Sequence, residues 1–187
     1  MRSKNITPQF LFLSITILLA AISRILPHPP NFTPIGAIAL FGGACFAEKK
    51  YAFIIPLLAM LISDCIYVPY SSSTGFHNTM LYVYASFILI TCIGIYIRAN
   101  AKAGNIVVAS VISSLLFFVI TNFGVWAAGG FQLGAAGLLN TYIIAIPFYN
   151  HSITGSFFAN TLAGDLFYCS ILFGSYYFAK SKFPVLA

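Results

Sequence analysis

The chain has 187 residues, of which 60% are hydrophobic and 6% are charged, and its mean hydropathy is +0.94. This composition excludes a protein that stays dispersed in water, and the length leaves room for about six spans of roughly 20 residues in one membrane domain. The net charge of +6 would suggest nucleic acid in a soluble protein, but here it comes from loops that meet anionic lipid, so we expect no nucleic-acid partner.

The first two apolar runs differ in length. The first covers about residues 8–26 and follows Arg2 and Lys4. A cleaved signal peptide is the competing interpretation, because these two basic residues could form its n-region. The second run, about 35–47, follows a proline-rich external turn at 27–34 and is short for a bilayer about 30 Å thick. Either the membrane thins there, or the turn dips into the membrane and is buried by other helices.

Four further runs follow, and a glycine-rich stretch separates the last two. The third and fourth cover about 51–68 and 79–97, and the fifth and sixth cover about 105–126 and 154–179. A seventh span within the intervening stretch, 127–152, would place the last basic residues outside. We therefore expect an external, partly helical segment between the fifth and sixth helices, which lies in the outer leaflet or re-enters it.

Basic residues predict the orientation of these spans. Eight of the nine Lys and Arg residues fall in four short clusters, where a chain that crosses six times would return to the same side. An excess of basic residues in alternate loops marks the cytoplasmic side. The sequence therefore predicts an all-α, multi-pass protein of the bacterial inner membrane, a compact bundle of six transmembrane helices with both termini cytoplasmic. The clusters are Arg2 and Lys4, Lys49 and Lys50, Arg98 and Lys102, and Lys180 and Lys182.

Polar and aromatic side chains concentrate in the outer half of the predicted bundle. An ionisable residue at membrane depth is costly unless it faces a cavity or a partner, and aromatic walls with a few convergent polar groups are typical of small-molecule sites. We therefore predict an outward pocket that binds a small solute. The candidate residues are Arg24, His28, Asn31, Asp64, Asn122, Trp126, Tyr149, Asn160 and Asp165.

Each candidate residue has an expected role. Asp64, Asp165 and Asn122 would form hydrogen bonds with the solute. Trp126 and Tyr149 would stack on it, whereas Arg24 would be a counter-ion and His28 part of a lid. The charge of the solute stays open, because Arg24 favours an anion and the two carboxylates favour a cation. The structural alternative is that Arg24 pairs with Asp64 or Asp165 to hold helices together, and that the aromatic residues form an interfacial belt.

Other chemistry has weaker support. Asp64 and three external histidines, His28, His77 and His151, could ligate Ni, Co or Zn, but the histidines are scattered over three loops and no pair brings two ligands onto one face. We therefore expect neither a metal site nor a cofactor. The four cysteines stand alone within spans and are typical of packing residues. The sequence contains no phosphate-binding loop motif, so ATP hydrolysis would need another subunit.

Several motifs resemble known membrane families. Six short spans, the proline-rich first loop and PLLAMLISD at 56–64 resemble the substrate-binding S components of energy-coupling factor transporters. More closely, four other motifs resemble an uncharacterised bacterial membrane family that we associate with the same superfamily. They are PHPPNFTPIGA at 27–37, TNFGVW at 121–126, IPF at 146–148 and GDL at 164–166.

This resemblance implies a subunit that captures a vitamin-like solute or a metal ion from outside and passes it inward. Such a subunit docks on a transmembrane coupling protein driven by two cytoplasmic ATPases, and the turn at 27–34 would act as its lid. The docking face in that family includes two small residues, usually alanines, four apart on the first helix. This chain departs from the pattern, because it has Thr16 and Ala20 there, with Arg24 on the next turn.

Two other functions stay open. The protein could be a scaffold or regulator of a partner complex rather than a transport subunit. It could also be a small intramembrane enzyme that uses His28 or His151 at the outer surface. We expect no enzymatic activity, because the sequence has no GxSxG elbow and no paired catalytic motif.

Overall fold

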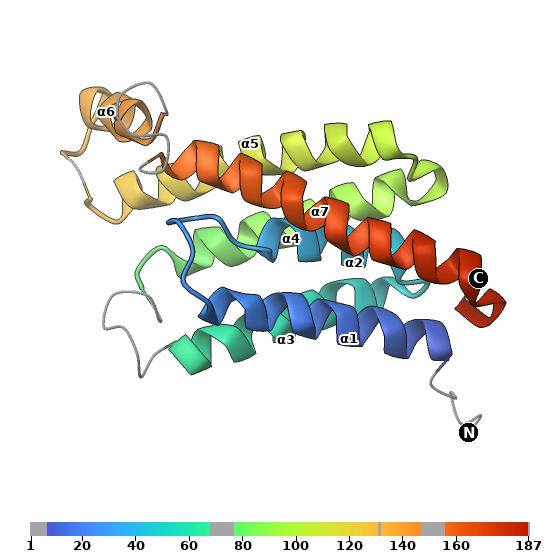
Figure 1. The fold of residues 1–187 in the computed structure, drawn as a ribbon. Coiled ribbons are helices and arrows are strands. Elements are labelled where there is room, and N and C mark those ends of the chain that lie inside the picture. The colour runs from blue at the N-terminus through green and yellow to red at the C-terminus, as the bar shows by residue number, and fades with distance from the viewer. Residues whose placement is uncertain (1–6, 68–76, 131, 147–155, 187) are drawn as a thin grey trace.

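The computed structural model describes residues 7–67, 77–130, 132–146 and 156–186. These residues form seven α-helices, and they include no β-strand (Figure 1). The all-helical architecture predicted from the sequence is therefore confirmed for this part of the chain. The helices are α1 (Pro8–Ile22), α2 (Ile35–Cys45), α3 (Lys49–Tyr67), α4 (Met80–Ile97), α5 (Ala103–Ala127), α6 (Ala135–Ala145) and α7 (Phe157–Lys182).

The lengths and the apolar composition of the helices are consistent with a helical membrane protein. Four described segments are long and apolar enough to cross a membrane: Pro8–Ile25, Met80–Asn100, Ala103–Ala127 and Phe157–Lys182. The helices α2 and α6 have 11 residues each, or about 16 Å at 1.5 Å per residue, which is about half of a bilayer core. The helix α6 lies within the glycine-rich stretch for which the sequence predicted a partly helical segment.

Helix ends differ from the sequence prediction by a few residues. The last helix, predicted to end at 179, continues to Lys182, because Lys180 and Lys182 in its last turn interact favourably with the negative end of the helix dipole. The second helix, predicted to end at 47, stops at Cys45, because Phe46 adopts an extended conformation.

The short helix α2 lies at the centre of the bundle. It packs against α1, α3, α4, α5 and α7, and nine of its eleven residues are buried. A helix that is apolar on every side suits this position, since it presents no polar face. Its closest approach is to α4, where a Cβ at Gly94 would lie only 2.9 Å from the Cα of Gly43. Small residues are what allow two helix backbones to approach so closely.

Replacing Gly94 with alanine should therefore destabilise the bundle. The added methyl group would meet the backbone of α2, which cannot move aside as a flexible side chain would. We expect the free energy of unfolding in detergent to fall by about 2 kcal/mol. Gly174→Ala is the matched control, because a Cβ there meets nothing within 4 Å. Equal effects of the two substitutions would contradict this interpretation of the α2–α4 contact.

Groups of opposite charge lie at the two ends of α2. At its C-terminal end, the Nη2 of Arg98 donates a hydrogen bond to the carbonyl of Gly43 (2.8 Å), and its Nη1 donates to the carbonyl of Ala47 (3.0 Å). At its N-terminal end lies the carboxylate of Asp165, which accepts a hydrogen bond from the backbone N–H of Ala37. Both charges complement the helix dipole, and they satisfy backbone groups that a helix end leaves without partners.

The ends of the helices that carry basic residues meet at one end of the bundle (Figure 1). Gln9 on α1 donates a hydrogen bond to the hydroxyl of Tyr176 on α7 (2.7 Å), and the ring of Phe10 packs against that of Tyr51 on α3. The hydroxyl of Tyr177 reaches the carbonyl of Ala101, between α4 and α5 (2.6 Å). The basic residues of these ends are Lys49, Lys50, Arg98, Lys102, Lys180 and Lys182.

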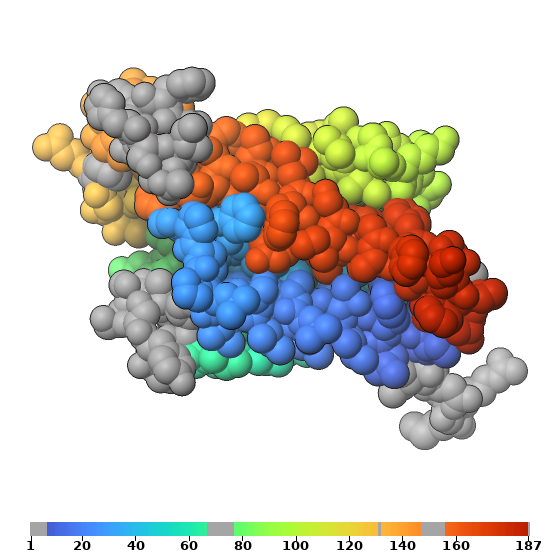
Figure 2. Space-filling view, in the orientation of Figure 1, coloured from blue at the N-terminus to red at the C-terminus, as the bar shows by residue number. Residues whose placement is uncertain are grey.

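The end of the turn that joins α1 to α2 packs against α7. Phe32 packs against Phe167 and Tyr168 of α7, with ring centroids 5.6 and 5.9 Å apart. A Cβ at Gly164 would lie 3.1 Å from the backbone nitrogen of Thr33, and Gly164 lies about 10 Å along the helix from the start of α7. Figure 2 shows this turn, in light blue, between α1 and α7. The end of the turn, from Phe32 to Pro34, therefore packs among the helices, whereas Pro27 and Pro29 to Asn31 are exposed.

Candidate functional site

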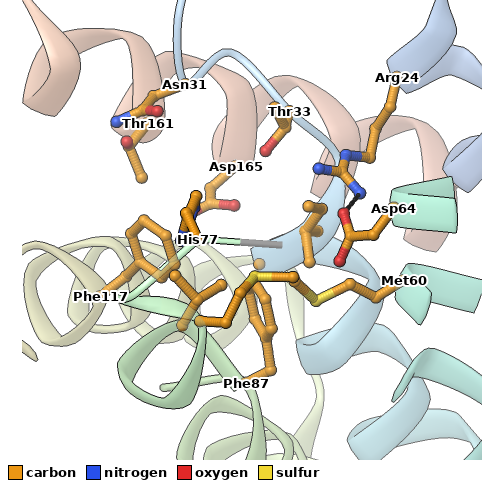
Figure 3. A pocket seen from close by; sticks show the side chains of 14 residues that line it. Arg24, Asn31, Thr33, Met60, Asp64, His77, Phe87, Phe117, Thr161 and Asp165 are labelled. Atoms are coloured by element: carbon orange, nitrogen blue, oxygen red, sulfur yellow. Dashed lines mark hydrogen bonds and ion pairs between the residues drawn. The ribbon is translucent and has the colours of Figure 1, made fainter. Parts of the chain in front are cut away.

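A cavity of about 140 Å³ lies beside the N-terminus of α2 (Figure 3). It is in the half of the bundle away from the basic ends. Figure 3 shows Asn31, Thr33, Thr161 and Asp165 on one side, with the apolar side chains of Phe87 and Phe117 on the other. The described residues that line the cavity are Arg24, Asn31, Thr33, Ile35, Gly36, Met60, Asp64, His77, Met80, Val83, Phe87, Phe117, Thr161 and Asp165.

An ion pair forms one wall of the cavity. The Nη1 of Arg24 lies 2.8 Å from Oδ1 of Asp64, and it also donates a hydrogen bond to the hydroxyl of Ser63. The hydroxyl of Tyr84 donates to the other carboxylate oxygen of Asp64 (3.1 Å). Asp64 is only 2% exposed, and a carboxylate tolerates such burial when both oxygens have partners. This cluster joins the end of α1 to α3 and α4.

A second carboxylate, that of Asp165, lies at the start of α2. It is 3% exposed, and its Oδ2 accepts a hydrogen bond from the hydroxyl of Ser114 on α5 (2.7 Å). The N–H of Ala37 donates a further hydrogen bond to it. Gly36 has to lack a side chain, because a Cβ there would lie 2.9 Å from the Cγ of Asp165. The carboxylate therefore links α2, α5 and α7 at the floor of the cavity.

The turn before α2 supplies the cavity with polar groups. Asn31 has a φ of 62°, a left-handed conformation that asparagine tolerates better than most residues. The carbonyl of Pro29 accepts a hydrogen bond from the N–H of Phe32 (3.0 Å), which closes the turn. The ring nitrogens of His28 lie 2.9 Å from the carbonyl of Pro29 and 3.2 Å from that of Arg24. His28 thus fastens the turn to the end of α1.

The structure brings four of the nine predicted site residues into the cavity: Arg24, Asn31, Asp64 and Asp165. Two others are neighbours that are not among its described lining. His28 contacts the backbone of Arg24, and Asn160 is buried on α7 immediately before Thr161. The structural alternative for Arg24 is also realised, since it pairs with Asp64. The same two side chains therefore hold helices together and line the cavity.

The remaining predicted residues lie apart from the cavity or outside the described residues. The amide of Asn122 donates a hydrogen bond to the carbonyl of Phe118, one turn earlier on α5 (2.8 Å). Trp126 packs against Phe123, with ring centroids 5.4 Å apart. Neither residue is among those that line the cavity. Tyr149 and His151 lie outside the described residues.

Sequence reasoning missed several lining residues, although some had a signal. Thr33 and Gly36 belong to the motif at 27–37, and Met60 belongs to the motif at 56–64. Thr161 precedes Asp165 by four residues, and this spacing places both on one face of a helix. The apolar lining of the cavity had no such signal, because an apolar side chain beside a cavity looks like any core residue in the sequence.

The cavity combines charged, polar and apolar side chains. Paired charges, hydroxyls and an amide face apolar side chains, which is the composition of small-molecule sites in general. Among the residues that the structure describes, no three His, Cys, Asp or Glu side chains come together as metal ligands would.

Comparison with known proteins gives a family and no function. No curated protein and no solved structure matches the chain. A family model described as a family of unknown function, DUF6580, matches residues 4–186, which is nearly the whole chain. The chain therefore belongs to the DUF6580 family.

Proposed function

We propose that the protein is the solute-binding subunit of a membrane transport system and takes up a small solute from the exterior. The observation that supports this proposal is a polar cavity inside an apolar bundle, lined by Arg24, Asp64 and Asp165. Ionisable groups within a membrane domain are rare, and they face the bundle interior or a cavity and mark substrate or ion pathways. A volume of about 140 Å³ is below the roughly 300–1,000 Å³ of drug-sized sites, so the solute is small.

The basic residues at one end of the bundle are the basis for its proposed orientation in the membrane. We infer six crossings, in which α2 and the turn at 27–34 together span the bilayer, and both termini are cytoplasmic. The basic residues gathered at one end of the bundle would then face the cytoplasm. The cavity lies in the opposite half, from which it would open to the exterior of a bacterial inner membrane.

The energy for uptake would come from partner subunits. By its resemblance to S components of energy-coupling factor transporters, the protein would dock on a transmembrane coupling protein that two cytoplasmic ATPases drive. Thr16 and Ala20 on α1 are both partly exposed, so a partner helix has access to them. A scaffold role would use similar helix surfaces but would not require a solute in the cavity. The experiment therefore looks for a bound solute.

The test is native mass spectrometry of the gently extracted protein from its own host. We expect a small solute to co-purify with the wild type and its occupancy to fall about tenfold in Thr161→Val, the effect of one lost hydrogen bond. Thr121→Val is the matched control. Both threonines donate to the carbonyl four residues earlier, with distances of 2.8 and 2.7 Å, but Thr121 is not among the described residues that line the cavity.

The outcomes separate the two functions. Loss of solute from the Thr161 variant alone, at an unchanged melting temperature, would support solute capture. A protein that carries a stable non-ATPase membrane partner and no solute would instead favour the scaffold. Equal loss of solute from both variants would show that the solute binds elsewhere.

A further inference from the structure

We propose that a groove between α5 and α7 binds an anionic phospholipid, with one acyl chain along the groove and the head group at Lys102. The groove has a volume of about 580 Å³ and is separate from the solute cavity. Figure 1 shows how it arises, since α5 and α7 lie close together near α6 and separate toward the opposite end. The proposal requires only that the protein lies in a membrane, and it does not rest on solute uptake.

The dimensions of the groove match one leaflet of a bilayer. Its lining runs from Lys102 to Ser110 on α5 and from Leu166 to Tyr177 on α7. At 1.5 Å per residue these stretches are about 12 and 16 Å long, and half of the hydrocarbon core of a bilayer is about 15 Å. An acyl chain that enters at the Lys102 end would therefore reach the middle of the membrane.

Small side chains keep the groove open. A Cβ at Gly174 would meet nothing within 4 Å, so the missing side chain leaves real space between the helices. At the end of the groove the hydroxyl of Tyr177 donates a hydrogen bond to the carbonyl of Ala101 (2.6 Å), which holds α7 to the turn before α5. The two helices are thus fixed relative to each other while a gap remains between them.

Charge at one end of the groove selects an anionic head group. Lys102 lines that end and is exposed. It is also the N-cap residue of α5, whose first turn contains no acidic residue and has no capping side chain. The positive end of the helix dipole and the ammonium group therefore favour the same anion. None of the three acidic residues of the chain, Glu48, Asp64 and Asp165, is among the residues that line the groove.

The head-group contact is tested by titrating delipidated protein with phosphatidylglycerol or phosphatidylcholine and counting bound lipids by native mass spectrometry. We expect the wild type to bind phosphatidylglycerol more tightly than phosphatidylcholine. In Lys102→Gln the ratio of the two affinities should fall about fivefold, the factor expected for one basic residue near an anionic group. Lys182→Gln is the control, since Lys182 is exposed on α7 but does not line the groove. Equal losses in both variants would overturn the proposal.

The apolar part of the site is tested by filling it. Gly174→Leu places a side chain in the open space, so we expect binding of both lipids to fall at least tenfold. Gly104→Leu is the control, because a Cβ there also meets nothing within 4 Å and Gly104 does not line the groove. Unchanged lipid binding in folded Gly174→Leu would overturn the proposal. If that variant did not fold, the lipid titration of Lys102→Gln would still test the proposal, because Lys102 is exposed.

Discussion

Replacing Gly36 with alanine is expected to lower the free energy of unfolding by about 2 kcal/mol, because overpacking at a closed site displaces its neighbours. The added Cβ would lie 2.8 Å from Oδ2 of Asp165 and 2.9 Å from its Cγ. The carboxylate cannot turn away freely, since Ser114 and the N–H of Ala37 both donate hydrogen bonds to it. The measurement is chemical unfolding in detergent, with Gly104→Ala as the control at a position where the Cβ meets nothing.

A double-mutant cycle shows whether the carboxylate of Asp165 is the reason that Gly36→Ala destabilises the protein. Asp165→Ala alone should cost about 2–3 kcal/mol, because it leaves buried donors without an acceptor. In that background Gly36→Ala should cost almost nothing, since the methyl group would occupy part of the space that the carboxylate leaves. Two losses that simply add would contradict the contact, because residues in contact are coupled whereas distant residues are not.

Replacing Arg24 with alanine is expected to cost about 3–5 kcal/mol, because it leaves a buried charge uncompensated. Asp64 is 2% exposed, and in this variant its carboxylate would still accept the hydrogen bond from the hydroxyl of Tyr84. Replacing both partners, as in Arg24→Met with Asp64→Leu, should cost much less than Arg24→Ala, because no buried charge is then left alone.

Thermal unfolding in detergent measures both changes. Lys50→Ala is the control for removing a positive charge, since Lys50 is exposed at the start of α3. A wild-type melting temperature in Arg24→Ala would show that the ion pair does not hold the ends of α1 and α3 together. A double variant as unstable as the single one would show that the pair matters for more than charge balance.

The helices were predictable from the sequence, and the path of the chain between them was not. Long apolar runs between basic clusters indicated α1, α4, α5 and α7 to within a few residues. For the short second run the sequence left two possibilities, a thinned membrane or a turn at 27–34 that dips into the membrane and is buried by other helices. The structure shows that only its end packs against α7, through Phe32 and Thr33, while Pro27 and Pro29 to Asn31 stay exposed.

The candidate site was predictable where charge was the signal. Arg24, Asp64 and Asp165 are conspicuous in an apolar chain, and all three line the cavity. The sequence places Asn122 and Trp126 in the outer half of the predicted bundle, and this placement predicts their depth in the membrane but not their distance from the cavity. They follow the lining residue Phe117 on α5 by five and nine residues, or about 8 and 14 Å along the helix.

The proposal of uptake depends on the cavity opening to the exterior, so labelling by a membrane-impermeant maleimide tests it most directly. The variants carry one cysteine, His77→Cys beside the cavity or Lys102→Cys at the basic end, with Cys45, Cys65, Cys92 and Cys169 replaced by alanine. Both test positions are exposed. In right-side-out membrane vesicles we predict labelling at position 77, and labelling at position 102 only after the membrane is permeabilised. The reverse pattern would place the cavity on the cytoplasmic side and contradict capture from outside.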